Sequence, residues 1–377
     1  MVIFGIFLLK PPSLSAESSK VELYLGADGF PNDYQGSARY KNSWMRVAHQ
    51  QSIGAFDFGA SVTLDDNFRE LNADGSYISF NLEDWVLGFG STDRHWSFSP
   101  HTSLIMSSNA RPVPSVYLKK EKLTRFSSKY LSWLGSLGGE VFLGVDREGS
   151  ESDSVNFFGA RLEVEPFSNF KLELLRTAQF TGGSKSFGSV LLGDTNEGTS
   201  REANQMAGFG ASYTRHNNRF YMQAIGEDEA GGLPSCWMYL AGFDRTAHFG
   251  GVPTTISLEL VDTRIDYTEN GYCGPNTAYN NGVHPYTNDG SVMGAPVDSE
   301  GRSIHLRAQH NFGVYDFDWG LGHYIVNANN SPQHRLSTQK VTGMTSYIGL
   351  NRKYEKLSIG SKISYRSFDL DKSGVER

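Results

Sequence analysis

The sequence contains no long hydrophobic run beyond its N-terminal segment. Hydrophobic residues make up 38% of the 377 residues, and the mean hydropathy is −0.39. A membrane-spanning helix needs about 20 consecutive apolar residues. Because no stretch after residue 9 approaches that length, the sequence excludes a helical membrane protein.

Cysteine and clustered positive charge are also scarce. The two cysteines, Cys236 and Cys273, both lie in stretches predicted to be loops. A disulfide and two unpaired thiols are both compatible with the sequence, because spacing does not show how closely the two Cα atoms approach. The net charge is −7, and no basic run is evident. This argues against nucleic acid as a partner, since phosphate neutralisation needs clustered Lys and Arg.

The sequence is instead rich in alternation between apolar and polar residues. Residues 56–64 show this pattern, and residues 158–165 and 315–321 repeat it. Side chains of a strand point alternately to opposite faces, so each such segment has one apolar and one polar face. About seventeen segments of this kind predict a sheet that closes around water and is surrounded by lipid.

We therefore predict an all-β fold, a large antiparallel transmembrane β-barrel of about 16–18 strands. The 13% aromatic content and the 41 glycines fit aromatic girdles and tight turns, although a soluble sandwich would share them. Four connections are far longer than is usual in compact domains, and we expect them to form extracellular loops that plug the lumen. They comprise residues 91–113, 181–206, 226–237 and 262–302.

Both ends of the chain differ from a barrel strand. Residues 1–16 have a short apolar core followed by two prolines and small residues, which indicates a partial secretion signal. Residues 20–377 are predicted to form a single outer-membrane β-barrel. Residues 369–377 have the composition of a turn that leads into a further strand, so we expect the last strand to be truncated. Such a barrel would show an open seam or an odd strand number.

Several local motifs resemble the Wzi family of outer-membrane capsule assembly proteins. The most specific are the strings NARPVP at residues 109–114 and GEDEAGGLPS at residues 226–235, accompanied by residues 85–90, 94–96, 159–162, 176–179 and 204–209. Their order and spacing are similar to that family from about residue 74 to the C-terminus. The resemblance implies a plugged outer-membrane barrel of about eighteen strands. It also implies a lectin that holds capsular or related polysaccharide at the cell surface.

Charged residues in and beside the predicted polar faces are candidates for a network that fastens the plug. Buried charges persist when they are paired and hydrogen-bonded. A direct role in binding acidic sugars is the alternative, because Arg can pair with their carboxylates. The candidates are Arg94, Arg111, Arg161, Arg176, Glu227, Asp228 and Glu229. The three consecutive carboxylates match the spacing of no calcium loop, so no metal site is predicted.

The connection formed by residues 262–302 is the predicted site of polysaccharide binding. Tyrosine offers flat apolar faces at low entropic cost, and asparagine offers hydrogen-bond donors and acceptors. The candidate residues are Tyr267, Tyr272, Asn276, Tyr279, Asn280 and Tyr286. The same composition is compatible with a segment that packs on itself and fills the lumen, and both interpretations stay open at this point.

The predicted function is non-enzymatic attachment of capsular or related polysaccharide at the bacterial outer membrane. The expected partners are the polysaccharide and outer-membrane lipid, the barrel is expected to be a monomer, and no cofactor is required. A porin or channel is the main alternative, and a barrel hydrolase acting on lipid is a second. The ten histidines stand in no recognisable nucleophile motif, which disfavours the hydrolase.

Overall fold

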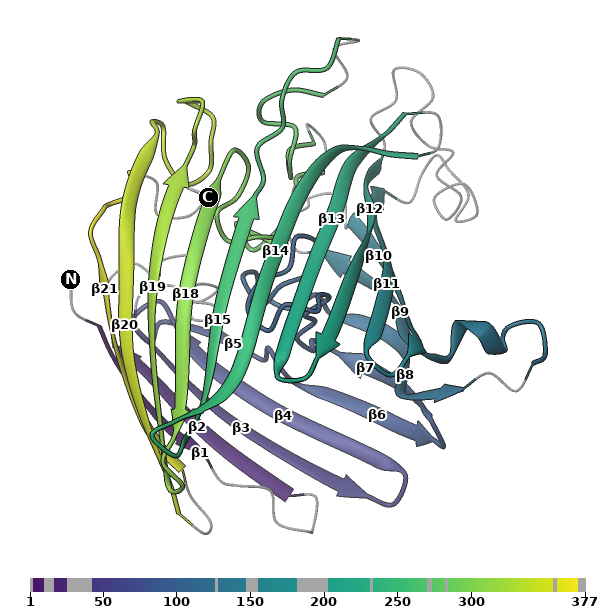
Figure 1. Ribbon diagram of the computed structural model, residues 1–377, viewed down its shortest axis with the longest axis vertical. Coiled ribbons are helices and arrows are strands. Elements are labelled where there is room, and N and C mark those ends of the chain that lie inside the picture. Colours follow the sequence, from purple (N-terminus) through teal and green to yellow (C-terminus); the bar gives the residue numbers. More distant parts are fainter. Residues whose placement is uncertain are drawn as a thin grey trace.

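The alternating segments form a closed antiparallel β-barrel in the computed structural model (Figure 1). Eighteen strands make the wall of the described chain, which confirms the predicted all-β barrel. The structure describes residues 3–9, 17–25, 43–125, 128–146, 155–181, 203–230, 233–269, 273–281, 284–354 and 358–371.

Each wall strand pairs antiparallel with the wall strands before and after it in chain order. The strands are β1 (Ile3–Leu9), β2 (Glu17–Leu25), β3 (Trp44–Ile53), β4 (Phe56–Asp65), β6 (Tyr77–Leu82), β7 (Trp85–Gly90), β8 (Ser115–Arg125), β9 (Ser136–Asp146), β10 (Val155–Phe167), β11 (Phe170–Thr181), β12 (Ala203–Arg215), β13 (Asn218–Ala230), β14 (Leu233–Phe249), β15 (Val252–Asp262), β18 (Arg302–Asn311), β19 (Tyr315–Val326), β20 (Val341–Lys353) and β21 (Ser358–Arg366).

Four short elements of the described chain lie outside this ring. β5 (Glu70–Asn72) pairs with the end of β4, and β16 (Thr287–Asn288) forms a small hairpin with β17 (Ser291–Val292). The 3-10 turn η2 (Ser132–Leu134) lies between β8 and β9. In the described part of the chain, no helix is long and apolar enough to cross a membrane.

The described wall strands leave no open seam, so the predicted seam is wrong. β1 pairs with β2 along one edge and with β21 along the other. An unpaired strand edge would leave backbone N–H and C=O groups without partners in lipid, and β1 occupies that edge here. The assignments of residues 1–16 to a secretion signal, of residues 20–377 to one barrel and of the C-terminus to a truncated strand stay predictions.

The wall has an apolar outer face and a polar inner face. In β4, Phe58 and Val62 are 39% and 48% exposed, whereas Ser61 and Thr63, on either side of Val62, are 2% and 0% exposed. The same alternation places Leu87, Phe89, Val116, Leu118, Val141 and Leu143 outside on β7, β8 and β9. An outward apolar band with polar residues inside is the arrangement of a membrane-spanning barrel.

One predicted loop is largely strand. β13 continues to Ala230 and β14 begins at Leu233, and Gly226 pairs with Trp237 and Asp228 with Ser235. The three carboxylates and two glycines of this stretch suggested a loop, but ladder hydrogen bonds extend the hairpin beyond its apolar part. Composition underestimated the length of these two strands, because backbone pairing in an antiparallel sheet also tolerates polar side chains.

Within the described residues, three connections fill the lumen, and we call them the plug: residues 91–114, the described residues of 263–301, and residues 327–340. The segment between β7 and β8 coils inside the barrel in Figure 1. The largest fully buried plug side chains are Trp96, Leu104, Ile105, Tyr279 and Tyr286. They belong to one apolar cluster with inward residues of the wall such as Phe142 and Phe157.

Candidate functional site

The segment 91–114 folds as a series of serine turns. The hydroxyl oxygens of Ser99, Ser103 and Ser107 each accept a hydrogen bond from the backbone N–H two residues later, over 2.9–3.2 Å. Ser99 and Ser103 also accept one from the N–H three residues later. Serine side chains stabilise turns by such local bonds. The spacing of these serines therefore folds the segment compactly inside the barrel.

Gln223 of β13 holds this segment against the wall. Its Nε2 donates to the carbonyl oxygen of Trp96 over 2.6 Å, and its Oε1 accepts from the N–H of Leu104 over 2.7 Å. Gln223 is fully buried, so these bonds satisfy backbone groups that water does not reach. Sequence reasoning missed this residue. Its inward position on an alternating strand was the available signal, but it gave no indication of the partner.

Arg94 makes a second attachment, to β8 and β9. Its Nε donates to Oε1 of Glu140 over 2.6 Å, and its Nη2 donates to Oγ of Ser115 over 2.9 Å. The guanidinium carbon lies 4.1 Å from the centre of the Phe142 ring. Nε1 of Trp96 donates to the other oxygen of Glu140 over 3.3 Å. The pair is largely buried, so it anchors the plug to the wall with the charges compensated.

Arg111 joins the plug to two further segments. Its Nε and Nη2 donate to the two carboxylate oxygens of Asp74, over 2.6 and 3.2 Å. Its Nη1 donates to Oδ2 of Asp289 over 3.2 Å. Asp74 precedes β6, and Asp289 lies in the turn between β16 and β17. One guanidinium therefore connects segment 91–114 with a rim loop and with the connection that follows β15.

Replacing Arg111 by alanine is expected to destabilise the folded barrel. The carboxylate of Asp74, which is 1% exposed, would lose its bidentate partner, and breaking a buried pair costs about 3–5 kcal/mol. Folded yield, read as the heat-modifiable band on a gel, should fall. A control is Arg245→Ala, in which the arginine lies on a wall strand outside the plug. A heat-modifiable band at the native level in the Arg111 variant would contradict this role.

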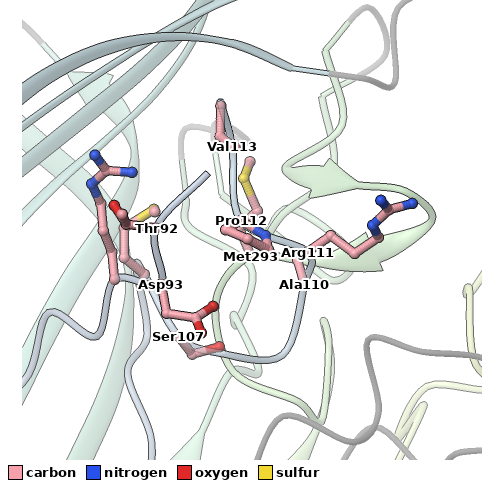
Figure 2. A pocket seen from close by; sticks show the side chains of 10 residues that line it. Thr92, Asp93, Ser107, Ala110, Arg111, Pro112, Val113 and Met293 are labelled. Carbon is pink, nitrogen blue, oxygen red and sulfur yellow. The ribbon is translucent and has the colours of Figure 1, made fainter. Parts of the chain in front are cut away.

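A small pocket lies beside Arg111 (Figure 2). Its lining includes Asp93, Ser107, Pro112 and Met293, and its free volume is about 10 Å³. That volume holds about one water molecule. The pocket is too small for a sugar ring, so polysaccharide binding requires a surface outside it.

The remaining charged candidates lie on the wall. Arg161 of β10 donates from Nε to Glu173 of β11 over 2.9 Å, and Nη2 of Arg176 donates to Gln205 of β12. Glu227 is buried on β13. The backbones of Asp228 and Glu229 belong to β13, but their side chains lie outside the described part of the structure, so their predicted role stays a prediction.

Tyr279 and Tyr286 are not surface residues, which corrects the predicted binding site. Both are 0% exposed, and their rings stack with centres 6.0 Å apart. The hydroxyl of Tyr279 donates to the carbonyl oxygen of Leu104 over 2.8 Å, and that of Tyr286 donates to Ile105 over 2.9 Å. A buried tyrosine hydroxyl needs an acceptor, and segment 91–114 supplies it. These tyrosines fill the lumen.

The other predicted binding residues differ in exposure. Tyr267 is 82% exposed. Asn280 is exposed, and its Oδ1 accepts a hydrogen bond from Nη1 of Arg335. Asn276 is partly buried and donates its backbone N–H to Glu300 over 3.0 Å. Tyr272 lies outside the described residues. Tyr267 and Asn280 are thus the described members of the predicted set most open to solvent.

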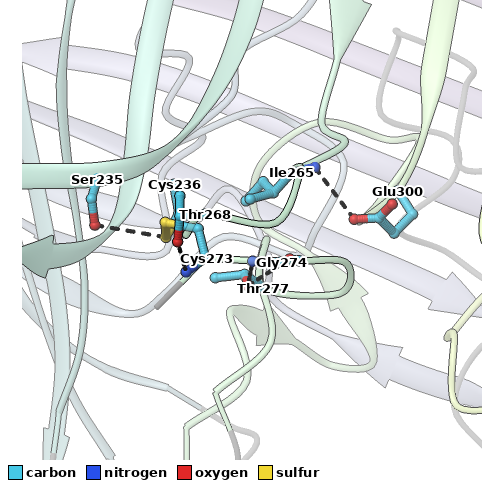
Figure 3. The surroundings of a disulfide bond; sticks show 8 residues. All are labelled: Ser235, Cys236, Ile265, Thr268, Cys273, Gly274, Thr277 and Glu300. Carbon is cyan, nitrogen blue, oxygen red and sulfur yellow. Dashed lines mark hydrogen bonds between the residues drawn. A yellow bond between two sulfur atoms is a disulfide. The ribbon is translucent and has the colours of Figure 1, made fainter. Parts of the chain in front are cut away.

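A disulfide ties the connection after β15 to the wall. Cys236 and Cys273 are bonded, with Cα atoms 5.3 Å apart, and Figure 3 shows the bond between β14 and the loop. Cys236 lies in β14 rather than in a loop. Thr268 supports the loop side, because its Oγ1 accepts a bond from the N–H of Cys273 over 3.1 Å. Of the two alternatives compatible with the sequence, the structure shows the disulfide.

An ion pair joins two of the plug connections, residues 263–301 and residues 327–340. Nε of Arg335 donates to Oδ2 of Asp298 over 2.7 Å, and Nη2 donates to Oδ1. Burial alone would raise the pKa of Asp298, but the nearby charges of Arg335 and His334 hold the pKa below its ordinary value. The carboxylate is therefore ionised in the folded protein, and the pair fastens residues 327–340 to the preceding connection.

The stability of this contact should depend on pH. Folding lowers the pKa of Asp298. The ion pair therefore contributes fully to stability at any pH above the pKa of unfolded Asp, about 4, and this contribution is lost as the pH falls through the lower pKa of the folded protein. We expect plug-opening events in planar bilayers to increase as the solution is acidified below about pH 4. In Asp298→Asn the opening frequency should be higher at neutral pH and change less with acid. An equal acid response in both proteins would contradict this account.

Comparison with known proteins decides the family. The sequence matches the family model for the capsule assembly protein Wzi over residues 20–372. The chain belongs to the Wzi family. With its apolar outer belt, this membership places the barrel in the bacterial outer membrane.

Other known proteins are also similar to this chain. Escherichia coli Wzi, described as a carbohydrate-binding β-barrel involved in group 1 capsule assembly, superposes with a TM-score of 0.73 at 18% identity, covering 98% of this chain and 84% of that one. An uncharacterized 55.8 kDa protein in the cps region of Klebsiella pneumoniae is 26% identical over 211 residues. The match spans 53% of this chain and 42% of that relative. An anion-selective porin from Comamonas acidovorans has a TM-score of 0.44 at 13% identity, covering 97% of this chain and 98% of that one.

Proposed function

We propose that this barrel binds capsular or related surface polysaccharide at its long-loop rim and helps attach the capsule to the cell surface. The filled lumen carries the proposal. Leu104, Ile105 and Tyr286 are fully buried where a pore would need water, and wall residues such as Gln223 and Glu140 bind the plug directly. A lumen filled in this way is unsuited to solute diffusion, which disfavours the porin alternative. The rim formed by the long connections is then the surface available to a polymer.

The exposed part of the connection after β15 has suitable chemistry. Tyr267 offers an accessible aromatic face, and aromatic rings make contact area at low entropic cost. Arg264 and Arg302 share the carboxylate of Asp262, with Nε–O distances of 3.0 and 2.7 Å. Asp266 and Glu300 also lie near Arg264, so this part of the rim offers guanidinium N–H donors to sugar oxygens rather than a net positive charge. These residues are the part of the rim that we assign to polysaccharide.

The proposed activity involves no chemical turnover and no cofactor. Each contact with a sugar would be weak, but a repeating polymer can engage several barrels. Once one repeat is bound, further attachments are effectively intramolecular, so avidity exceeds the affinity of a single barrel. A monomeric barrel present in many copies is sufficient for this mode of attachment.

Polysaccharide retention tests the proposal. A deletion strain should release surface polysaccharide, and the native gene should restore retention. Purified barrel with Tyr267→Ala should bind the polysaccharide about two- to tenfold more weakly, from the loss of an aromatic contact of about 0.5–1.5 kcal/mol. Tyr130→Ala is a matched control, because Tyr130 is 84% exposed but lies between β8 and β9. Unchanged retention after deletion would contradict the proposal.

A further inference from the structure

The connection between β8 and β9 has a charge opposite to that of the chain. Residues 119–134 contain one acidic residue, Glu121, and five basic ones, whereas the whole chain has a net charge of −7. We call residues 119–134, without residues 126–127, the β8–β9 hairpin. The basic residues are Lys119, Lys120, Lys122, Arg125 and Lys129. The cluster forms no continuous basic run, because Glu121 and apolar residues lie between the basic ones.

Three of these basic residues are available for a ligand. Lys119 pairs with Glu121 over 3.0 Å, and Lys120 pairs with Asp84 over 3.4 Å. Lys122, Arg125 and Lys129 are exposed, and within the described chain no ion pair holds them. The hairpin therefore presents uncompensated positive charge.

The same hairpin exposes large apolar side chains. Tyr130 is 84% exposed, Trp133 is 71% exposed and Leu131 is 40% exposed. The turn η2 contains no buried residue, so these side chains do not contribute to a core. Figure 1 shows the segment around η2 projecting away from the barrel, at the right of the view. Exposed aromatic residues beside basic ones are typical of segments that lie in a membrane interface.

The hairpin is continuous with the apolar belt of the barrel. At its base, a Cβ on Gly135 would lie 1.9 Å from the carbonyl oxygen of Glu165, and Gly135 has a φ of +73°. Glycine thus allows the hairpin to lie directly against the end of β10. At the neighbouring turn between β10 and β11, the side chain of Phe167 is 68% exposed. On the other side, Lys120 lies 5.3 Å from the ring centre of Trp85, which is 41% exposed on the outer face.

We propose that the β8–β9 hairpin binds the headgroups of anionic phospholipids in the leaflet next to the short-turn rim. Outer-membrane barrels have short periplasmic turns, and the hairpin lies at the rim with the tight turns after β6 and β10. Tyr130 and Trp133 enter the interface, and Lys122, Arg125 and Lys129 contact phosphate. Each basic residue near an anionic surface adds about fivefold to binding. Continuity with the belt favours a lipid surface over a separate protein.

An environment-sensitive fluorophore at Ser132→Cys tests this proposal in the full-length barrel, since both native cysteines are bonded to each other. The barrel is reconstituted in phosphatidylethanolamine vesicles with or without phosphatidylglycerol, with nitroxide placed near the headgroups. Quenching should be several-fold stronger in the anionic vesicles and should weaken with salt. In K122Q/R125Q/K129Q it should fall to the neutral-vesicle value. The same label at Asn217→Cys, in the β12–β13 turn, should not respond to lipid charge.

Two outcomes would overturn the proposal. Quenching at position 132 that is weak and independent of lipid charge would show that the hairpin stays in water. Protection of the label in neutral detergent that rises with protein concentration would instead indicate a second copy of the chain as the occupant. The heat-modifiable band of every variant shows whether it has folded. Because Tyr130 and Trp133 lie outside the proposed polysaccharide surface, Y130S/W133S should lose lipid contact and keep polysaccharide binding.

Discussion

Replacing Gln223 by leucine is expected to open the plug. The side chain binds the carbonyl oxygen of Trp96 and the N–H of Leu104, over 2.6 and 2.7 Å, at a fully buried position. Leucine would leave the N–H of Leu104 unpaired, at about 1–3 kcal/mol, whereas the carbonyl oxygen of Trp96 would keep its bond from Oγ of Ser103 over 2.8 Å. The equilibrium for plug opening should therefore rise about 5- to 100-fold, since each 1.4 kcal/mol is tenfold. Planar-bilayer recordings should show conductance bursts that native barrels lack.

Gln309→Leu is the matched control for this substitution. Gln309 lies on wall strand β18 but is exposed. Recordings of the Gln309→Leu variant should therefore be the same as those of the native barrel. If the Gln223 variant stayed as silent as this control, the wall-to-plug hydrogen bonds would not hold the plug closed.

Removing the disulfide should also loosen the plug by a large factor. The bond closes a loop with a sequence separation of 37, which corresponds to about 4 kcal/mol in the chain-entropy description. In Cys236→Ser/Cys273→Ser, the connection after β15 should leave the wall more often. Limited proteolysis at the rim, followed by mass spectrometry, should then cleave this connection much faster than in the native barrel.

The reductant response provides the control for this prediction. Prolonged reduction of the native barrel should reproduce the serine variant, whereas the serine variant itself should not respond to reductant. Equal cleavage rates in the native and double-serine proteins would show that packing of Tyr279 and Tyr286 is sufficient to hold the connection.

The sequence predicted the wall because one local rule controls it. A strand between lipid and a polar interior must alternate, and Phe58 and Ser61 of β4 obey this rule. The boundaries of β13 and β14 were less predictable, because backbone pairing continues where the side chains are polar. The position of β1 beside β21 depends on closure of the whole ring and was not evident locally.

The plug was predictable in kind but not in its contacts. Loop length and inward charge indicated that segments fill the lumen. However, the partner of Arg94 is Glu140, which no motif in the sequence singles out. Tyr279 and Tyr286 have the composition of a sugar site, yet their hydroxyls bind carbonyls more than 170 residues earlier in the chain. Such long-range contacts leave no local pattern, so composition did not distinguish a surface tyrosine from a buried one.

Liposome swelling of the native barrel tests the central claim most directly, which is that wall and plug together close the lumen. Vesicles that contain the folded protein and are placed in an isotonic sugar solution should swell no faster than protein-free vesicles. Swelling as rapid as that produced by a general porin would show an open lumen and would contradict the account of a plugged, polysaccharide-binding barrel.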